Sequence, residues 1–176
     1  TILDGNTTSA DREAAMAKAE QQPAAAIAAL AAGLPVEGVS PAEAQKEEYR
    51  RIPWIWRIAI AAGRRNDAAQ LREIITVSLP KDGEPLRDWQ SVVIGGGVVN
   101  GITQAGIWPR QRIAELLKDQ PEQAALWDRS LELAAKMTDD KAVPHGTRYD
   151  ALRILGVDTW SKRGEQVVRY AAKGTN

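Results

Sequence analysis

Apolar residues recur every three to four positions along most of this 176-residue chain, and that spacing is typical of amphipathic helices. Short turns rich in proline, glycine and aspartate separate the periodic segments, as at Pro80-Lys81-Asp82-Gly83. Alanine, the strongest helix former, occurs 29 times, whereas phenylalanine is absent. Runs of alternating polarity, which would indicate strands, are few. The pattern therefore predicts an all-α fold of roughly ten helical segments.

Several helix boundaries follow from capping chemistry. Ser40-Pro41-Ala42-Glu43 combines a capping box with proline at the first helical position, so a helix is expected to begin there. It should run to about Arg51 and be broken or kinked at Pro53. The next segment, to about Arg65, is apolar on most faces and is expected to be a central helix. Further helices are predicted over 11–22, 23–33, 68–79, 85–105, 109–118, 121–137, 145–156 and 158–173.

Short connections between these segments favour antiparallel helix pairs. Equivalent helix starts recur at intervals of about 35 to 45 residues, which is typical of helical repeat proteins. We therefore expect one domain over residues 1–176: a HEAT-like α-solenoid, that is, a right-handed superhelix of antiparallel helix pairs. Both ends follow or precede helical patterns closely, so the chain is expected to be a fragment of a larger protein.

Two parts of the sequence resemble known repeat proteins. Residues 148–156 (RYDALRILG), followed by Trp160 and 166–170 (QVVRY), resemble a HEAT repeat. Residues 56–67 (WRIAIAAGRRND) and 77–90 (VSLPKDGEPLRDWQ) resemble the helical region of large bacterial proteins of the membrane-bound dehydrogenase type, which are multidomain haem-binding proteins. The likeness covers most of residues 50–176.

The resemblance implies a spacer between a propeller-like domain and a c-type haem domain, in a protein that is exported to the periplasm or the cell surface. It implies no catalytic or haem residues here, because no position of this chain matches them. The redox groups of such a protein would lie outside this segment.

Composition excludes several kinds of site. Lys+Arg and Asp+Glu are equal at 23 each, which gives no electrostatic pull toward nucleic acid. The chain has no cysteine and a single histidine, His145, so thiolate metal sites, covalent haem and multi-histidine sites are excluded. Asp139-Asp140 lacks the ligand spacing of a calcium loop and is interpreted as a solvated helix end. No apolar run approaches a membrane span of about 20 residues. We therefore predict a non-catalytic segment with no cofactor and no bound metal.

Residues 91–102 (SVVIGGGVVNGI) allow two interpretations. They resemble the strand, glycine turn and helix that bind a dinucleotide such as FAD or NAD, and their glycines are Gly95, Gly96, Gly97 and Gly101, with Gly95 and Gly97 as the first and second of the motif. Asn100 stands where the third glycine of that motif belongs, and no second strand follows. The favoured interpretation is a buried helix from about Pro85 to Ala105, with glycines where neighbouring helices cross closely. Three consecutive glycines then cost roughly 2–3 kcal/mol relative to alanine.

The residues most suited to bind a partner are arginines interleaved with tryptophans, since both are common at the centres of interfaces. The expected partner is a protein or a neighbouring domain of the same polypeptide. An alternative is a carbohydrate-binding helical domain that uses Trp54, Trp56 or Trp108. The predicted interaction surface consists of Trp54, Arg57, Arg64, Arg65, Trp108 and Arg110.

Overall fold

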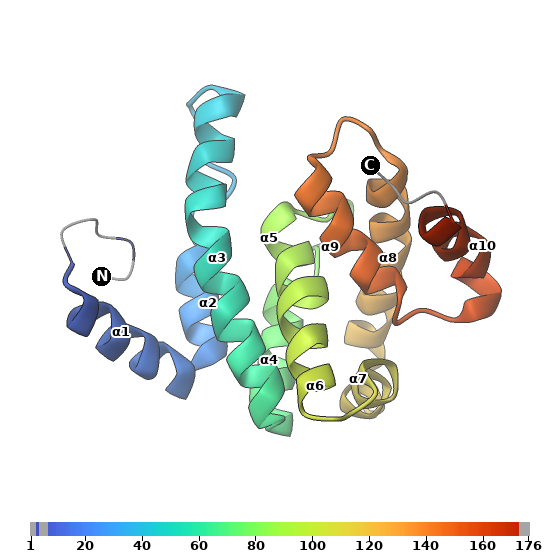
Figure 1. Ribbon diagram of the computed structural model, residues 1–176, viewed down its shortest axis with the longest axis horizontal. Coiled ribbons are helices and arrows are strands. Elements are labelled where there is room, and N and C mark those ends of the chain that lie inside the picture. Colours follow the sequence, from blue (N-terminus) through green and yellow to red (C-terminus); the bar gives the residue numbers. More distant parts are fainter. Residues whose placement is uncertain (1–2, 4–6, 173–176) are drawn as a thin grey trace.

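In the computed structural model the chain is all-helical, as the periodicity predicts, and no strand occurs among the residues described, which are residue 3 and residues 7–172. The helices follow one another with short connections (Figure 1). Their bounds are α1 (Ser9–Gln21), α2 (Pro23–Ala31), α3 (Pro41–Arg65), α4 (Ala68–Ser78), α5 (Asp88–Ser91), the π-helix η1 (Val92–Val98), α6 (Val99–Gln104), α7 (Pro109–Leu117), α8 (Pro121–Asp139), α9 (His145–Leu155) and α10 (Trp160–Ala172).

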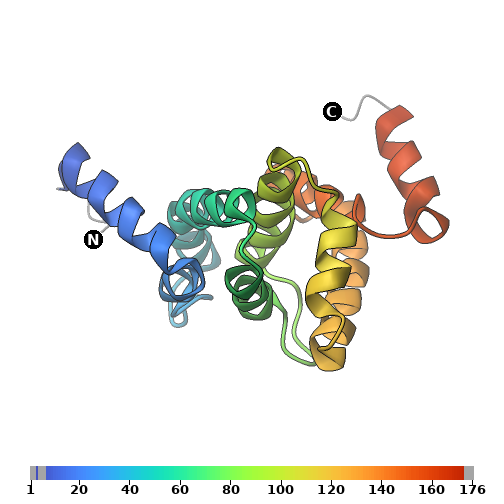
Figure 2. The same ribbon diagram turned by 90° about the horizontal axis from the view of Figure 1, so that it is seen from below.

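The central helices lie in two rows. Figure 2 shows α3, the helix formed by α5, η1 and α6, and α9 side by side in one row, with α2, α4 and α8 in the other. Helix α7, which contacts α4, α6 and α8, crosses from one row to the other. The most extensive contacts within the first row join α3 to η1 and α6, and η1 to α9; between the rows, α2 packs on α3 and α8 on α9. The buried core lies between the two rows, and Ile58, Ile74 and Ile94 are fully buried there. The helices α1 and α10 lie at the two ends of the array.

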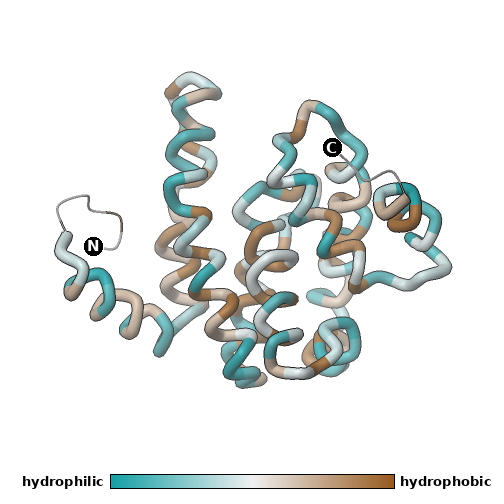
Figure 3. The backbone as a smooth tube through the Cα atoms, in the orientation of Figure 1, coloured by the Kyte–Doolittle hydropathy of each residue, from teal (hydrophilic) through white to brown (hydrophobic). Residues whose placement is uncertain are grey.

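Helix α3 begins at the predicted capping box but does not break at proline. Ser40 Oγ accepts a hydrogen bond from the Glu43 N–H, and Glu43 accepts one from the Ser40 N–H at 3.0 Å. The predicted break at Pro53 does not occur, because α3 continues to Arg65. Pro53 is exposed, so water can satisfy the carbonyl that loses its helical partner. The first half of α3 is hydrophilic and extends beyond its neighbours (Figure 3).

The ambiguous glycine segment is helical. Residues 88–104 form one continuous helix in which the central part, Val92–Val98, is a π-helix and is entirely buried. The predicted helix over 85–105 is thus confirmed, with a start three residues later. No strand leads into the glycines, so the strand–turn–helix geometry that a dinucleotide site requires is not formed.

Glycines are needed here because three helices approach closely. We call Gly63, Gly95, Gly96, Gly97 and Gly101 the glycine seam. A methyl group on Gly101 would lie 2.8 Å from the Cα atom of Gly63 and would also meet the backbone of α3. On the other side, a methyl group on Gly95 would meet a backbone carbonyl of α9 and, at 2.8 Å, the Ile154 side chain. Backbone therefore packs on backbone at Gly95 and Gly101, while methyl groups on Gly96 and Gly97 would meet the side chains of Trp56 and Ala59. This close approach explains why the sequence accepts the helix cost of three glycines in a row.

Helix α10 is attached differently. Gly164 is its one buried residue in the described chain, and the Trp160 ring of the same helix folds over it. Polar contacts fasten the helix to α8: the Tyr170 hydroxyl donates to the Thr138 carbonyl at 2.8 Å, and Arg169 pairs with Asp139 at 2.8 Å. Few backbone contacts join α10 to α9. α10 is therefore a surface helix held by hydrogen bonds and by ion pairs, the second of which joins Arg163 to Glu132 of α8.

Candidate binding surfaces

A groove lies between α7, α8 and the start of α10. It has a volume of about 390 Å³, and its floor is apolar. The larger floor side chains are themselves nearly buried, and Trp127 has 8% of its surface exposed, whereas Ala114 is exposed. We call this hollow the α7–α8 groove. Its apolar lining comes from Ile113, Ala114, Leu117, Ala124, Trp127, Leu131 and Val157.

Charged side chains surround this floor. Arg110 and Lys118 come from the two ends of α7, and Lys162 comes from the first turn of α10. Two carboxylates also line the groove. Asp158 is bound to Arg163 at 3.0 Å, whereas Asp128 is exposed. The groove therefore combines an apolar floor with a mainly cationic rim.

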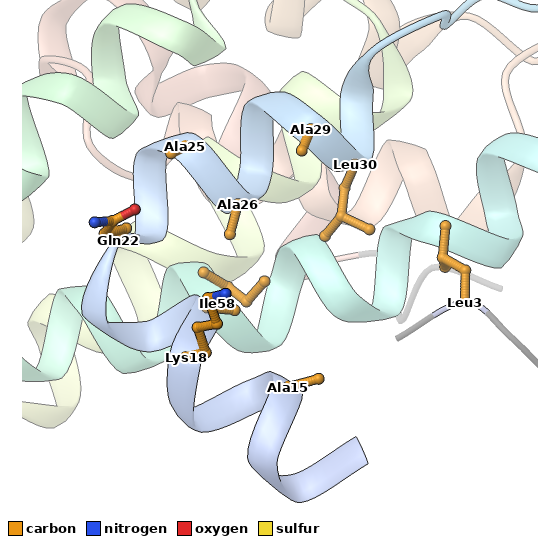
Figure 4. Close-up of a pocket in the computed structure, with 10 residues that line it drawn as sticks. Leu3, Ala15, Lys18, Gln22, Ala25, Ala26, Ala29, Leu30 and Ile58 are labelled. Atoms are coloured by element: carbon orange, nitrogen blue, oxygen red, sulfur yellow. The ribbon is translucent and has the colours of Figure 1, made fainter. Parts of the chain in front are cut away.

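A second hollow lies at the other end of the molecule, between α1, α2 and α3, with a volume of about 620 Å³. Figure 4 shows Ala26 and Leu30 of α2 pointing toward α3, and Ala15 standing on α1. Lys18 and Gln22 are its polar members. Alanines supply half of the lining residues, so we call it the alanine groove. A wall of methyl groups offers shape and apolar area but few groups that could orient a polar ligand.

The predicted surface residues do not all come together. Trp54 and Arg57 do, because the Arg57 guanidinium lies over the Trp54 ring, 5.3 Å from its centroid. Arg64 is exposed farther along α3. Arg65 is instead engaged in the fold: it donates to the Glu20 carbonyl, pairs with the Glu20 carboxylate at 3.5 Å and so links α1 to α3.

Trp108 and Arg110 lie at the start of α7, on a different helix from the other predicted residues. Trp108 immediately precedes the helix and has 80% of its surface exposed, the most of any large apolar side chain in the described residues. Arg110 is exposed and lines the α7–α8 groove. Arg110 thus lines a groove that the sequence pattern does not indicate, because α10, which forms one wall of the groove, lies more than 40 residues later in the chain.

A polar junction that the sequence did not indicate joins α3, α5 and α9. The Thr147 hydroxyl donates to Asp88 at 2.9 Å, and the Tyr49 hydroxyl lies 3.0 Å from the Thr147 oxygen. Glu48 accepts the Trp89 N–H at 3.1 Å, at the first turn of α5. Burial and the nearby Asp88 carboxylate raise the pKa of Glu48. Partners 39 to 98 residues apart leave no local spacing that could have predicted this junction.

The structure also shows where His145 and Asp139 lie. His145 is exposed at the start of α9. Asp139 accepts hydrogen bonds from Arg169 and Tyr170, so it fastens α10. Within residue 3 and residues 7–172, no group of three or more histidine, cysteine, aspartate or glutamate side chains could hold a metal ion. Across the same residues, no helix is both long and apolar enough to cross a membrane.

Comparison with known proteins identifies no relative of this chain. No family model matches the chain, and neither a curated protein nor a solved structure is significantly similar to it. Inferences about function therefore rest on the surfaces described above.

Proposed function

We propose that this chain is a non-catalytic protein-interaction module, and that its helix pairs form a HEAT-like solenoid in a larger bacterial polypeptide, which the resemblance implies is a redox protein. The order of elements supports the repeat arrangement, since α2 with α3, α4 with the composite helix and α8 with α9 alternate between the two rows. In stacks of this kind, each pair buries its apolar face against its neighbours.

The observation that carries the interaction role is the pair of open, largely apolar grooves at the two ends of the array. Both lie between neighbouring helices and are lined mainly by alkyl side chains. Grooves between helices are suited to receive a helix of another protein or domain. The polar junction, in contrast, consists of side chains that hydrogen-bond one another across three helices, which is a structural use of those groups.

The test is affinity enrichment with the immobilised chain and three variants. Ala29→Glu places a carboxylate in the alanine groove, Ala114→Glu places one in the α7–α8 groove, and Ala125→Glu changes an exposed alanine that lines neither. We expect at least one protein to be retained by the native chain and by Ala125→Glu but lost from a groove variant. Circular dichroism confirms that each variant is folded.

Two results would contradict the proposal. The first is a retained set that does not differ between the native chain and the bare support. The second is a clear rise in melting temperature on addition of FAD or NAD, because ligands that bind the folded state stabilise it. That rise would instead support the dinucleotide interpretation of the glycine segment.

A further inference from the structure

The α7–α8 groove has the pattern of a helix-binding site along both of its walls. Residues of α7 that line it stand at positions i, i+3, i+4, i+7 and i+8, so they occupy one face of that helix. Those of α8 stand at i, i+3, i+4 and i+7 and likewise share one face. The α7 set is Arg110, Ile113, Ala114, Leu117 and Lys118, and the α8 set is Ala124, Trp127, Asp128 and Leu131.

The rim carries an excess of positive charge. Arg110, Lys118 and Lys162 are exposed, and none of them forms an ion pair within the described residues. Of the two carboxylates of the lining, Asp158 pairs with Arg163, which also pairs with Glu132, and Asp128 forms no ion pair within the described residues. Three cations against two carboxylates give the lining a formal charge of about +1. The chain as a whole is neutral, so this is a local feature.

The two cations of α7 are too far apart to suit a compact anion. Arg110 and Lys118 are eight residues apart on α7 and its cap, which corresponds to about 12 Å along the helix axis. A partner helix of two to three turns spans that distance and can carry a carboxylate near each end. Its apolar face would lie on the floor formed by Ile113, Leu117 and Trp127.

We propose that the α7–α8 groove binds a short acidic amphipathic helix of a partner protein. The apolar face of that helix lies on the groove floor, and its carboxylates pair with Arg110, Lys118 and Lys162. This assignment rests on the proposed interaction role and adds the site and the chemistry of the partner. The mode is that of a helix in a groove, in which apolar anchors give affinity and flanking charges give orientation and faster association.

Fluorescence anisotropy with a synthetic peptide tests the assignment. The probe is a labelled helical peptide of about twelve residues, with leucines along one face and glutamates beside them. A second probe replaces every glutamate with glutamine. We expect the native chain to bind the glutamate probe more tightly, with an affinity that falls as salt rises.

Variants of the chain then test whether the probe binds in the α7–α8 groove. The double substitution Arg110→Glu with Lys162→Glu should weaken binding of the glutamate probe on the order of tenfold or more. Ala114→Glu should weaken binding of both probes, because it introduces a charge into the floor. Lys46→Glu, at an exposed lysine of α3 outside the groove, is the matched control and should leave binding unchanged. Circular dichroism of each variant shows whether it is folded.

Three outcomes would overturn the assignment. They are equal affinity for the two probes, binding that survives both groove variants, and a dimer of this chain that Ala114→Glu abolishes, which would make a second copy the occupant. If the probe fails but enrichment still recovers a protein lost from Ala29→Glu, then the groove assignment is wrong and the interaction role stands. If the enrichment fails as well, both are wrong.

Discussion

The glycine seam and helix α10 are attached to the rest of the molecule in opposite ways. At the seam, helices α3, η1, α6 and α9 approach until backbone meets backbone, and all five glycines are buried. At α10, a single glycine is buried and the attachment consists of hydrogen bonds and ion pairs near the surface. Close packing is lost when one methyl group is added, whereas exposed ion pairs contribute little each.

These two kinds of attachment imply different contributions to the stability of the domain. The seam couples the helices of one row, so damage there should lower the stability of the whole domain. α10 can detach without exposing a large apolar surface, so its opening should be a local event. Because Lys162 of α10 lines the α7–α8 groove, the less firmly attached element also forms part of the proposed binding site.

The largest effect is expected for Gly101→Ala. The added methyl group meets backbone atoms of α3, including the Gly63 Cα at 2.8 Å, and backbone cannot move aside as a side chain can. We expect a loss of about 3 kcal/mol or more in the free energy of unfolding, measured by urea denaturation. Gly146→Ala is the control, because its methyl group meets nothing within 4 Å. A Gly101→Ala protein within about 1 kcal/mol of the native chain would contradict the close approach.

Gly97→Ala tests the contact between η1 and α3, because its effect can be compensated by a smaller residue on α3. Its methyl group would collide with the Cβ atom of Ala59 on α3, which is the closest atom on that side. We expect a loss of about 1–3 kcal/mol. The double variant Gly97→Ala with Ala59→Gly moves the methyl group across the contact and should recover part of that loss. Additive effects of the two substitutions, measured by a double-mutant cycle, would show that the two positions do not touch.

A smaller and local effect is expected for Asp139→Asn. The substitution removes the ion pair with Arg169, whose partners are about half exposed, and weakens the hydrogen bond from Tyr170. We expect at most about 1 kcal/mol in global stability, because exposed pairs contribute little. Hydrogen exchange should instead accelerate in α10 and remain unchanged in α3 and α6. A loss of stability as large as that at the seam would mean that α10 belongs to the cooperative core.

The smallest effect is an opposite pH response of the two regions. Burial raises the pKa of Asp150, with partial opposition from Arg153, and this carboxyl group lies against the seam at Gly96. The pKa of Asp139 is lowered: burial would raise it, but hydrogen bonds from Tyr170 and Arg169 outweigh that effect.

The signs of the two contributions follow from linkage. A raised pKa in the folded state means that protonation of Asp150 favours folding, so the seam gains stability as the pH falls through that pKa. A lowered pKa means that Asp139 stabilises above its ordinary pKa, and this stabilisation is lost as the pH falls through the folded value. Hydrogen exchange, corrected for intrinsic rates, should show more protection of the seam and less of α10 at acidic pH. Asp150→Asn and Asp139→Asn should each remove one response.

The sequence predicted the helical content and many helix boundaries because those depend on local signals. The capping box at Ser40 and the apolar period of α4 and α8 are of this kind. The break expected at Pro53 does not occur, because the effect of a proline within a helix depends on its exposure, which is a tertiary property. The glycine triplet could be placed in a buried helix from the sequence, but its partners Ala59 and Asp150 could not be identified.

The candidate site was less predictable than the fold. Arg110 was selected for its charge beside a tryptophan, and it does line a groove. Arg65 was selected for the same reason, yet it binds Glu20, because nothing in a linear pattern says which arginine finds a carboxylate across a helix contact. The sequence does not indicate Lys118 and Lys162 as binding residues, since the face they share forms only when α10 folds against α8.

The π-helix in Val92–Val98 has a further consequence for how this protein can change by insertion or deletion. A π turn accommodates one more residue than an α turn, so it shifts the helical phase of everything after it. Deleting a single residue from the triplet, with a return to α geometry, would remove that extra residue and leave α6 close to its present phase. An α-helix of unchanged length would instead rotate α6 by roughly 100°, the angle of one residue. Gly101 would then face away from Gly63, and a side chain would take its place at the crossing. The length of this short segment, as well as its composition, therefore sets the alignment of the two helices.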